Sequence, residues 1–199
     1  MSHERQIFWA SHVAHHQSED YNLSTALRQT GTGAFVTWVF FIPVFLLGVP
    51  SFVFVSVASI NLIYQFWVHS EHIPKLGWYE KFFVTASNHR VHHAQNDNYI
   101  DKNYGGVFII WDRMFGTFKE EDESEAPIYG IRGTLNTFNP IWANLHIYIS
   151  MAKDIWYAQS WKDKFFVPFA KTGWKPSSLP EKPAKDNFNS QTFQKYNPQ

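Results

Sequence analysis

Residues 32–48 read TGAFVTWVFFIPVFLLG, and residues 50–68 read PSFVFVSVASINLIYQFWV. The surrounding stretch, residues 29–70, contains no Asp, Glu, Lys or Arg. At about 1.5 Å per residue, each block would form a helix of roughly 26 to 28 Å, close to the roughly 30 Å hydrocarbon core of a bilayer. Pro43 predicts a kink in the first helix, and Pro50 predicts a turn between the two. We therefore expect residues 32–68 to form a helical hairpin that enters and leaves a membrane from one side.

The alternative is a buried pair of core helices in a water-soluble domain. Both blocks are apolar on every face, and the rest of a 199-residue chain could hardly cover two such helices. Four basic residues, Arg28, Lys75, Lys81 and Arg90, flank the open end of the hairpin. Because basic residues favour the cytoplasmic side of a membrane, we expect that end to face the cytoplasm.

Composition excludes several classes of protein. The chain has 17 basic and 17 acidic side chains, whereas nucleic-acid binding needs a basic surface, so nucleic acid is not an expected partner. The sequence has no cysteine, which excludes disulfide frameworks, thiolate metal sites and cysteine nucleophiles. It also lacks the H-E-x-x-H, G-x-S-x-G and G-x-G-x-x-G patterns of zinc proteases, serine hydrolases and dinucleotide-binding proteins.

Histidine carries the strongest motif in the sequence. Nine of the ten histidines fall into three clusters, and the pattern H-x-x-H-H occurs twice. The clustered histidines are His3, His12, His15 and His16, then His69 and His72, then His89, His92 and His93. On a helix, positions i, i+3 and i+4 share a face, so each box predicts three imidazoles that point the same way. His146 stands alone on a predicted helix, and we expect it to be an ordinary buried side chain.

Two H-x-x-H-H boxes that face each other would form a metal centre. With His3 and His69 they offer eight imidazole nitrogens, too many for one tetrahedral zinc and suitable for two metal ions. A hairpin returns the chain to the membrane face at which it entered, so residues 12–16 and 69–93 can converge there. His72 either binds metal or simply neighbours His69. No carboxylate near the clusters has the spacing of an iron site with two histidines and one carboxylate.

The boxes and the segments around them resemble a known superfamily. The segments are SEDYNLSTALR at residues 18–28, QFWVH at residues 65–69 and DKNYGGVFIIWDRMFGTF at residues 101–118. Together they resemble the fatty acid hydroxylase / sterol desaturase superfamily, and within it the branch that contains alkylglycerol monooxygenase and bacterial sterol desaturase family proteins. The similarity extends from Met1 to about residue 175. It implies an all-α, integral membrane domain in which an all-histidine di-iron centre uses O2 to hydroxylate or desaturate a lipid.

The resemblance also implies roles for individual residues. Its second box falls on His12, His15 and His16, its last box on His89, His92 and His93, and its intermediate ligand on His69. Its first box reads H-x-x-x-H-E, of which His3-Glu4 is the second half. The missing histidine would precede Met1 by two residues, together with earlier membrane helices, so we expect this chain to be N-terminally truncated.

The implied enzyme requires several partners. Its substrate would be a fatty acid, a sterol or an ether lipid, and its cofactors two iron ions, with zinc as a substitute. Electrons would come from an external haem protein, a ferredoxin or a reduced pterin. Glu4, Asp101 and Asp112 are candidates to accept hydrogen bonds from the ligand imidazoles. Two alternatives stay open: an inactive, zinc-loaded or metal-free structural membrane protein, and a lipid-binding module whose histidines respond to pH.

The rest of the chain yields four simpler predictions. Residues 119–127, KEEDESEAP, are interpreted as a solvated acidic loop. Asn139 and Pro140 should open an amphipathic helix as N-cap and first residue. Its apolar stripe would lie on the membrane surface or pack on the catalytic segment; the stripe comprises Ile141, Trp142, Leu145, Tyr148, Ile149, Ala152, Ile155 and Trp156. Residues 1–175 would form one di-iron domain, and residues 176–199 a disordered tail.

Overall fold

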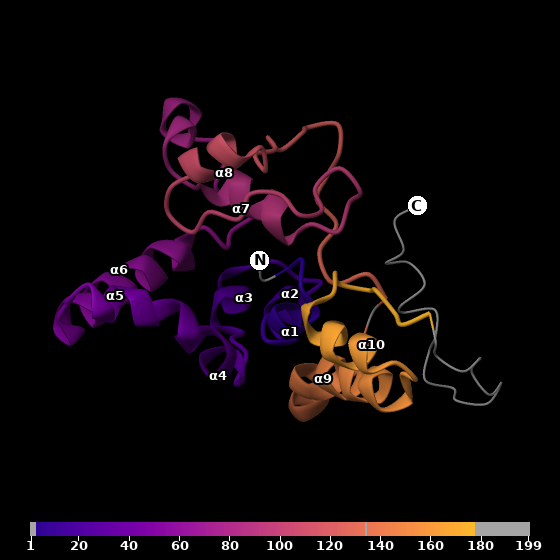
Figure 1. The fold of residues 1–199 in the computed structure, drawn as a ribbon. Coiled ribbons are helices and arrows are strands. Elements are labelled where there is room, and N and C mark those ends of the chain that lie inside the picture. Colours follow the sequence, from indigo (N-terminus) through magenta and orange to yellow (C-terminus); the bar gives the residue numbers. More distant parts are fainter. Residues whose placement is uncertain (1–2, 134, 178–199) are drawn as a thin grey trace. The chain divides into compact units, whose positions relative to one another are not determined.

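The computed structural model describes residues 3–133 and 135–177, and all regular secondary structure in them is helical (Figure 1). The all-α class predicted from the sequence is therefore confirmed. The chain divides into two compact units, each described here by itself. The first unit comprises residues 1–17, 30–36 and 131–199, and the second comprises residues 18–29 and 37–130. The predicted tail at residues 176–199 lies, apart from its first two residues, outside the described part of the chain.

The first unit is built around one long helix. Helix α9 (Pro140–Tyr157) packs against α1 (Gln6–Ala10), α2 (Val13–His16), α10 (Trp161–Phe166) and η3 (Val167–Phe169). Its apolar core contains Trp9, Ala10, Val13 and Ile147. Asn139 caps α9 as predicted, because its side chain accepts hydrogen bonds from the amides of Ile141 and Trp142.

Helix α9 packs through a different face from the predicted stripe. Its buried residues are Ala143, His146, Ile147, Met151 and Asp154. Several members of the predicted stripe are instead exposed, among them Ile141, Leu145, Ile149 and Trp156. These members therefore do not pack inside the unit, and the predicted alternative, that the stripe lies on a membrane surface, stays a prediction. Helix α9 carries apolar residues on more than one side, and periodicity cannot rank two such faces.

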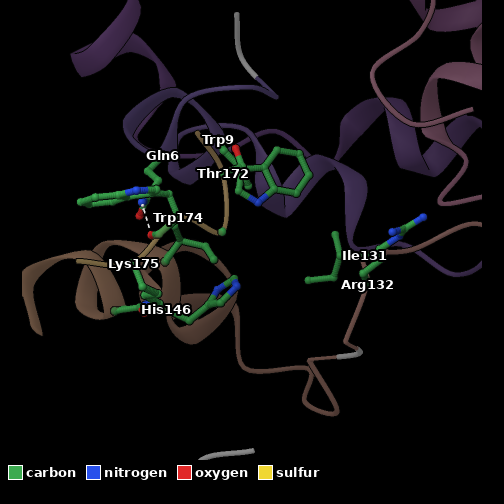
Figure 2. Close-up of a pocket in the computed structure, with 11 residues that line it drawn as sticks. Gln6, Trp9, Ile131, Arg132, His146, Thr172, Trp174 and Lys175 are labelled. Atoms are coloured by element: carbon green, nitrogen blue, oxygen red, sulfur yellow. Dashed lines mark hydrogen bonds between the residues drawn. The ribbon is translucent and has the colours of Figure 1, made fainter. Parts of the chain in front are cut away.

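A pocket opens in the first unit beside α9 (Figure 2). His146 lies at its wall with its Nδ1 atom donating to the carbonyl oxygen of Trp142 at 3.1 Å. The side-chain amide of Gln6 donates to the carbonyl oxygen of Trp174, a neighbouring lining residue, at 2.8 Å. The other labelled lining residues are Trp9, Ile131, Arg132, Thr172 and Lys175.

The second unit contains the predicted hairpin. Its first arm is broken into α4 (Gly33–Thr37), which begins in the first unit, η1 (Trp38–Phe41) and α5 (Ile42–Leu46), with Pro43 in the first turn of α5. Its second arm is α6 (Ser51–Trp67), and Phe54 of α6 packs on Phe41 and Phe45 at ring separations of 5.0 Å. Gly48 turns the chain with a φ of 82°, which glycine adopts at little cost.

The expected kink at Pro43 thus appears as a break between short helices. Pro43 lacks an amide hydrogen, so it starts a new helix more readily than it continues one. Among the described residues, none of the helices has both the length and the apolar character needed to cross a membrane.

The remainder of the second unit fixes the short helix that carries the last histidine box. This helix, α7 (Ala86–His93), begins with a capping box between Thr85 and Asn88. Buried Glu80, in η2 (Gly77–Lys81), accepts hydrogen bonds from the hydroxyls of Thr85 and Ser87 at 2.7 and 2.8 Å. The unit is completed by α3 (Leu23–Leu27) and α8 (Ile110–Phe115).

Candidate metal centre

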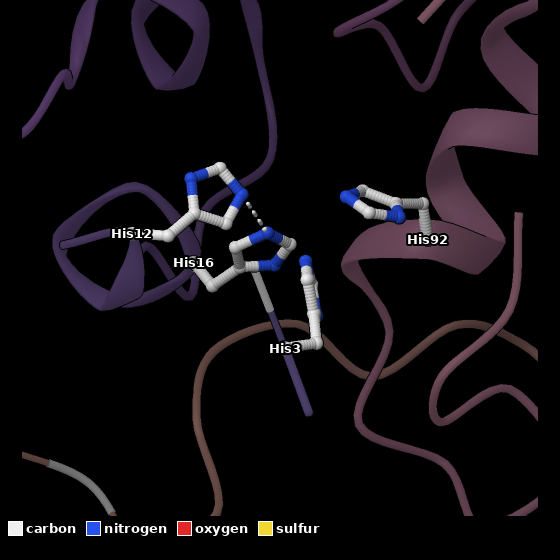
Figure 3. A group of neighbouring side chains, drawn as sticks. All are labelled: His3, His12, His16 and His92. Carbon is white, nitrogen blue, oxygen red and sulfur yellow. Dashed lines mark hydrogen bonds between the residues drawn. The ribbon is translucent and has the colours of Figure 1, made fainter. Parts of the chain in front are cut away.

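The first unit brings together three histidines of the N-terminal clusters. Ring nitrogens of His3, His12 and His16 lie within 4.8 Å of one another. Figure 3 shows the rings of His12 and His16 turned toward each other, with His3 beside them. The Nε2 atoms of His12 and His16 are 3.1 Å apart. Trp9 packs against this group, with its ring 5.3 Å from that of His3 and 5.7 Å from that of His16. The three imidazoles therefore form a compact set with an aromatic wall.

The first H-x-x-H-H box lies at the start of α2. His12 is the N-cap residue, with a φ of −131°, and His15 and His16 lie within the helix. His15 is buried, and its ring is 5.2 Å from that of His12 and 5.3 Å from that of His16. The spacing thus brings His12 and His16 into one group of neighbouring ring nitrogens, with His12 joining from the cap. His15 is not in that group, so the box does not direct all three imidazoles to one site as predicted.

The second unit forms an equivalent set. Ring nitrogens of His69, His89 and His93 lie within 4.8 Å of one another, and all three side chains are buried. The Nε2 atom of His89 is 3.0 Å from that of His69 and 3.2 Å from that of His93. His69 follows the end of α6, whereas the other two lie one turn apart in α7. His92 of the same box stacks on His89 at a ring separation of 5.1 Å.

Backbone carbonyl groups orient two of these imidazoles. The Nδ1 atom of His69 donates to the carbonyl oxygen of Gln65 at 2.7 Å, and Nδ1 of His92 to that of Lys102 at 3.3 Å. A donating Nδ1 leaves Nε2 as the nitrogen with a free electron pair for a metal. The sequence contained a signal for the first acceptor, because His69 follows Gln65 by four residues at a helix end, where carbonyl groups lack helical partners.

Burial keeps two of the second unit's imidazoles neutral. Desolvation lowers the pKa of His69, against the opposing effect of its hydrogen bond to Gln65. It also lowers the pKa of His92 from 6.5 to about 4, although Lys102 and Asp112 act in the opposite direction. Neutral imidazole is the form that binds metal ions, so both side chains are in the binding form at pH 7.

Tyr21 is a residue of this region whose role the sequence did not reveal. Its buried hydroxyl donates to the carbonyl oxygen of Val68 at 3.1 Å, and burial raises its pKa, so it stays a donor. Its ring lies 5.7 Å from that of His69 and 5.1 Å from that of His93. Tyr21 thus supports two histidines of the second set at once. Its only sequence signal is its place within residues 18–28.

The three carboxylates proposed as hydrogen-bond acceptors lie in different surroundings. Glu4 and Asp101 are exposed. Asp112 is buried, but its carboxylate accepts from the amides of Tyr104 and Gly105 and from the hydroxyl of Thr117. Within the described residues, its hydrogen bonds therefore hold a loop and do not reach an imidazole, although its charge acts on the pKa of His92.

Two other histidines lie apart from these sets. His72 is exposed on the segment after α6 and belongs to neither group of neighbouring ring nitrogens. His146 is buried in the first unit, and burial lowers its pKa. Its Nδ1 atom donates to the carbonyl oxygen of Trp142, so His146 is a buried, hydrogen-bonded side chain of the kind expected from the sequence.

The donor chemistry fits a transition metal. Each unit offers three imidazoles with neighbouring nitrogens, and the chain has no thiol. Imidazole suits iron and zinc, whereas magnesium and calcium prefer oxygen ligands. The residues present thus fit the iron that the sequence predicts, and they also fit zinc.

The sequence profile described as fatty acid hydroxylase matches residues 1–117. The chain belongs to the fatty acid hydroxylase family. The part that matches this family contains the hairpin and all nine clustered histidines. No solved structure matches the chain.

The chain is similar to two kinds of curated lipid enzyme. The chain is 47% identical to human alkylglycerol monooxygenase over 88% of its length, and 43% identical to the Xenopus tropicalis enzyme of that name over 91%. It is 28% identical over 67% of its length to an ornithine lipid hydroxylase of Rhizobium tropici. The matched parts are 39%, 41% and 40% of these relatives, so the chain spans about two fifths of their length.

Proposed function

We propose that this chain forms the histidine-bearing part of an O2-dependent lipid hydroxylase with a di-iron centre. The proposal is based on the two imidazole sets, one in each unit. Within each set, the ring nitrogens lie within 4.8 Å of one another. Three closely spaced imidazole nitrogens are a large part of the coordination shell of a transition metal. The proposed ligands are His3, His12, His15, His16, His69, His89, His92 and His93.

The proposed substrate is a lipid with a long alkyl chain. The similar proteins are named alkylglycerol monooxygenase and ornithine lipid hydroxylase, and both names describe insertion of oxygen into a lipid. We therefore favour hydroxylation over desaturation and an ether lipid over a sterol. Insertion of one oxygen atom of O2 into a C–H bond reduces the other to water, which requires two electrons and two protons. An external donor, such as a haem protein, a ferredoxin or a reduced pterin, would supply the electrons.

Bound iron would supply the redox chemistry that activates O2 for attack on an alkyl C–H bond. The protein's own contribution is to hold the ligands in the correct tautomer and to keep them dry. The carbonyl groups of Gln65 and Lys102 accept from Nδ1 of His69 and His92, so Nε2 is the nitrogen with which each imidazole would hold an ion. Tyr21 packs against two of the rings and limits their movement.

The hairpin is proposed to enter a membrane from its cytoplasmic side and to guide the lipid toward the histidines. Large apolar side chains on both arms are exposed, and those at the tip are among the most exposed, at 81% for Leu46 and 85% for Leu47. Contiguous exposed apolar surface of this kind is typical of membrane or partner contact. Lys75 and Lys81 near the open end agree with a cytoplasmic orientation.

The proposal is tested by turnover with labelled oxygen. The chain is supplied with an alkylglycerol, a reductant and ¹⁸O2, and the lipid is analysed by mass spectrometry. We expect one labelled oxygen atom in the product, and no product when the donor is omitted although the metal content stays constant. His89→Ala should abolish the reaction, whereas His72→Ala, an exposed histidine outside both sets, should retain it. Unlabelled product, or equal loss in both variants, would contradict the proposal.

A further inference from the structure

The acidic segment at residues 119–127 is not a fully solvated loop. Glu120 is exposed, but the Glu121 side chain is only 12% exposed and forms an ion pair with Arg90. Arg90 lies inside the last histidine box, directly after His89, and its own side chain is 9% exposed. Sequence reasoning missed this pair because its members are 31 residues apart and belong to different segments.

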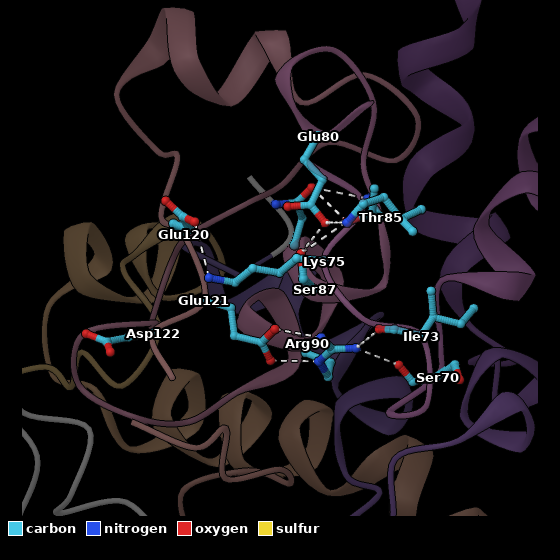
Figure 4. A network of polar contacts seen from close by, with 12 residues as sticks. Ser70, Ile73, Lys75, Glu80, Thr85, Ser87, Arg90, Glu120, Glu121 and Asp122 are labelled. Carbon is cyan, nitrogen blue, oxygen red and sulfur yellow. Dashed lines mark hydrogen bonds and ion pairs between the residues drawn. The ribbon is translucent and has the colours of Figure 1, made fainter. Parts of the chain in front are cut away.

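The Arg90 guanidinium connects three segments of the second unit (Figure 4). Its Nε and Nη2 atoms donate to the two carboxylate oxygens of Glu121, both at 2.6 Å. Its Nη1 atom donates to the carbonyl oxygens of Ser70 at 2.9 Å and Ile73 at 2.8 Å. All three nitrogens are thereby used, in a planar arrangement that lysine cannot reproduce.

The contacts of Arg90 join two segments that each carry a proposed metal ligand. Arg90 follows His89, and Ser70 follows His69, so the hydrogen bond between Arg90 and Ser70 joins the neighbours of two proposed ligands. The Nε2 atoms of these two histidines are 3.0 Å apart. Residues 70–76 form no helix or strand, so the geometry of His69 depends on what holds this segment. The guanidinium supplies two of its anchoring hydrogen bonds.

Glu121 also balances charge near the proposed centre. A lone guanidinium beside the histidines would repel a metal cation, whereas the ion pair is neutral overall. A buried ion pair is rarely the most stable choice, since apolar residues of similar size often stabilise a fold as well or better. Stability alone therefore does not explain the pair.

We propose that Arg90 and Glu121 are positioning residues that hold His69 against His89 and so assemble the second unit's metal ligands. This inference rests on the proposed function. It assigns to the acidic segment a role in the centre although none of its residues is a ligand.

The chain contains a matched control. Lys75 and Glu120 form a second ion pair from the same acidic segment at 3.2 Å, with exposures of 31% and 67%. Glu120→Gln and Glu121→Gln are the same chemical change at adjacent positions. Both pairs reach residues 70–76, but Lys75 lies toward the far end of this segment, whereas the Arg90–Glu121 pair contacts Ser70 and Ile73, the part that follows His69 directly.

The experiment compares the two variants with the unchanged chain. Amide hydrogen exchange of iron-free protein reports on residues 70–73, which Arg90 contacts and which exclude Lys75, and ferrous iron titration reports on binding. We expect Glu121→Gln to raise exchange in this segment and to weaken iron binding about 10- to 100-fold, the usual effect of losing a partner of a metal ligand. Glu120→Gln should change neither. Unchanged exchange and binding in Glu121→Gln would overturn the proposal.

A second variant separates positioning from stability. Arg90→Met combined with Glu121→Leu removes both charges and should fold, because buried ion pairs tolerate apolar replacement. We still expect weaker iron binding and faster exchange at residues 70–73. A folded double variant that matches the original in both measurements would overturn the inference. If the unchanged chain binds no iron, the proposed function fails, and the exchange comparison alone then decides whether the pair holds the segment.

Discussion

Asp112→Asn should destabilise the second unit by about 2 to 4 kcal/mol, because the buried carboxylate is the acceptor for three donors. Its Oδ1 atom accepts from the amide of Tyr104 at 2.7 Å and from the hydroxyl of Thr117 at 2.6 Å. Its Oδ2 atom accepts from the amide of Gly105 at 2.8 Å. Asparagine keeps one oxygen, so it can retain the first two bonds only if its NH2 group faces the Gly105 amide.

The magnitude follows from this mismatch. Loss of one hydrogen bond to a charged group costs about 1.5 to 3 kcal/mol, and the two remaining bonds weaken by about 0.5 to 1 kcal/mol together when their acceptor becomes neutral. The Gly105 backbone has little room to move away, since a Cβ built there would lie 2.7 Å from the carbonyl oxygen of Phe108. For a chain of this length the thermal midpoint should fall by about 4 to 16 °C.

The assay is thermal unfolding of the iron-free protein in detergent, followed by tryptophan fluorescence. Asp122→Asn makes the same change at an exposed position and should leave the midpoint where it is. A change of less than about 2 °C in Asp112→Asn would refute the reasoning. Loss of iron binding without loss of stability would assign Asp112 to the metal centre and not to the loop.

Three further variants probe other contacts. Gly105→Ala should destabilise by about 1 to 3 kcal/mol because its Cβ would meet backbone, whereas Gly31→Ala, with open space around it, should leave the thermal midpoint unchanged. The pKa of His146 is lowered in the folded protein, so the unfolded chain takes up a proton first as the pH falls through about 6.5, and the free energy of unfolding declines by at most about 1.4 kcal/mol per pH unit. His146→Gln should therefore reduce the pH dependence of the thermal midpoint. An identical pH dependence in the variant would contradict this. Tyr21→Phe should lower the free energy of unfolding by about 1 kcal/mol through the lost hydrogen bond to Val68, while the iron content, measured by metal analysis, is retained. Loss of iron would show that the hydroxyl is needed for metal binding as well.

Local patterns in the sequence predicted several features correctly. The spacing of the two boxes gathered His12 with His16 and His89 with His93, because a helix brings positions four apart to one face. Asn139 caps its helix because its side chain alone supplies the acceptor for the first amides. These features depend on neighbours within a few residues, which a sequence displays directly.

Features that depend on distant partners could not be predicted in this way. The acidic segment appeared solvated, since nothing near Glu121 in the sequence points to Arg90. The Asp112 carboxylate could accept a hydrogen bond from a histidine, but it accepts from the loop around Gly105 instead. Helix α9 could have packed through either apolar face, and contacts with α1 decided the choice. In each case, the outcome depends on which segments pack together.

The central claim is that the two imidazole sets bind two iron ions, and metal content tests it most directly. The chain is purified in detergent without oxygen, ferrous iron is supplied, and iron and zinc are counted per chain. The account predicts about two irons per chain, with a clear loss in His89→Ala and none in His72→Ala. Zinc alone, or no bound metal, would contradict it.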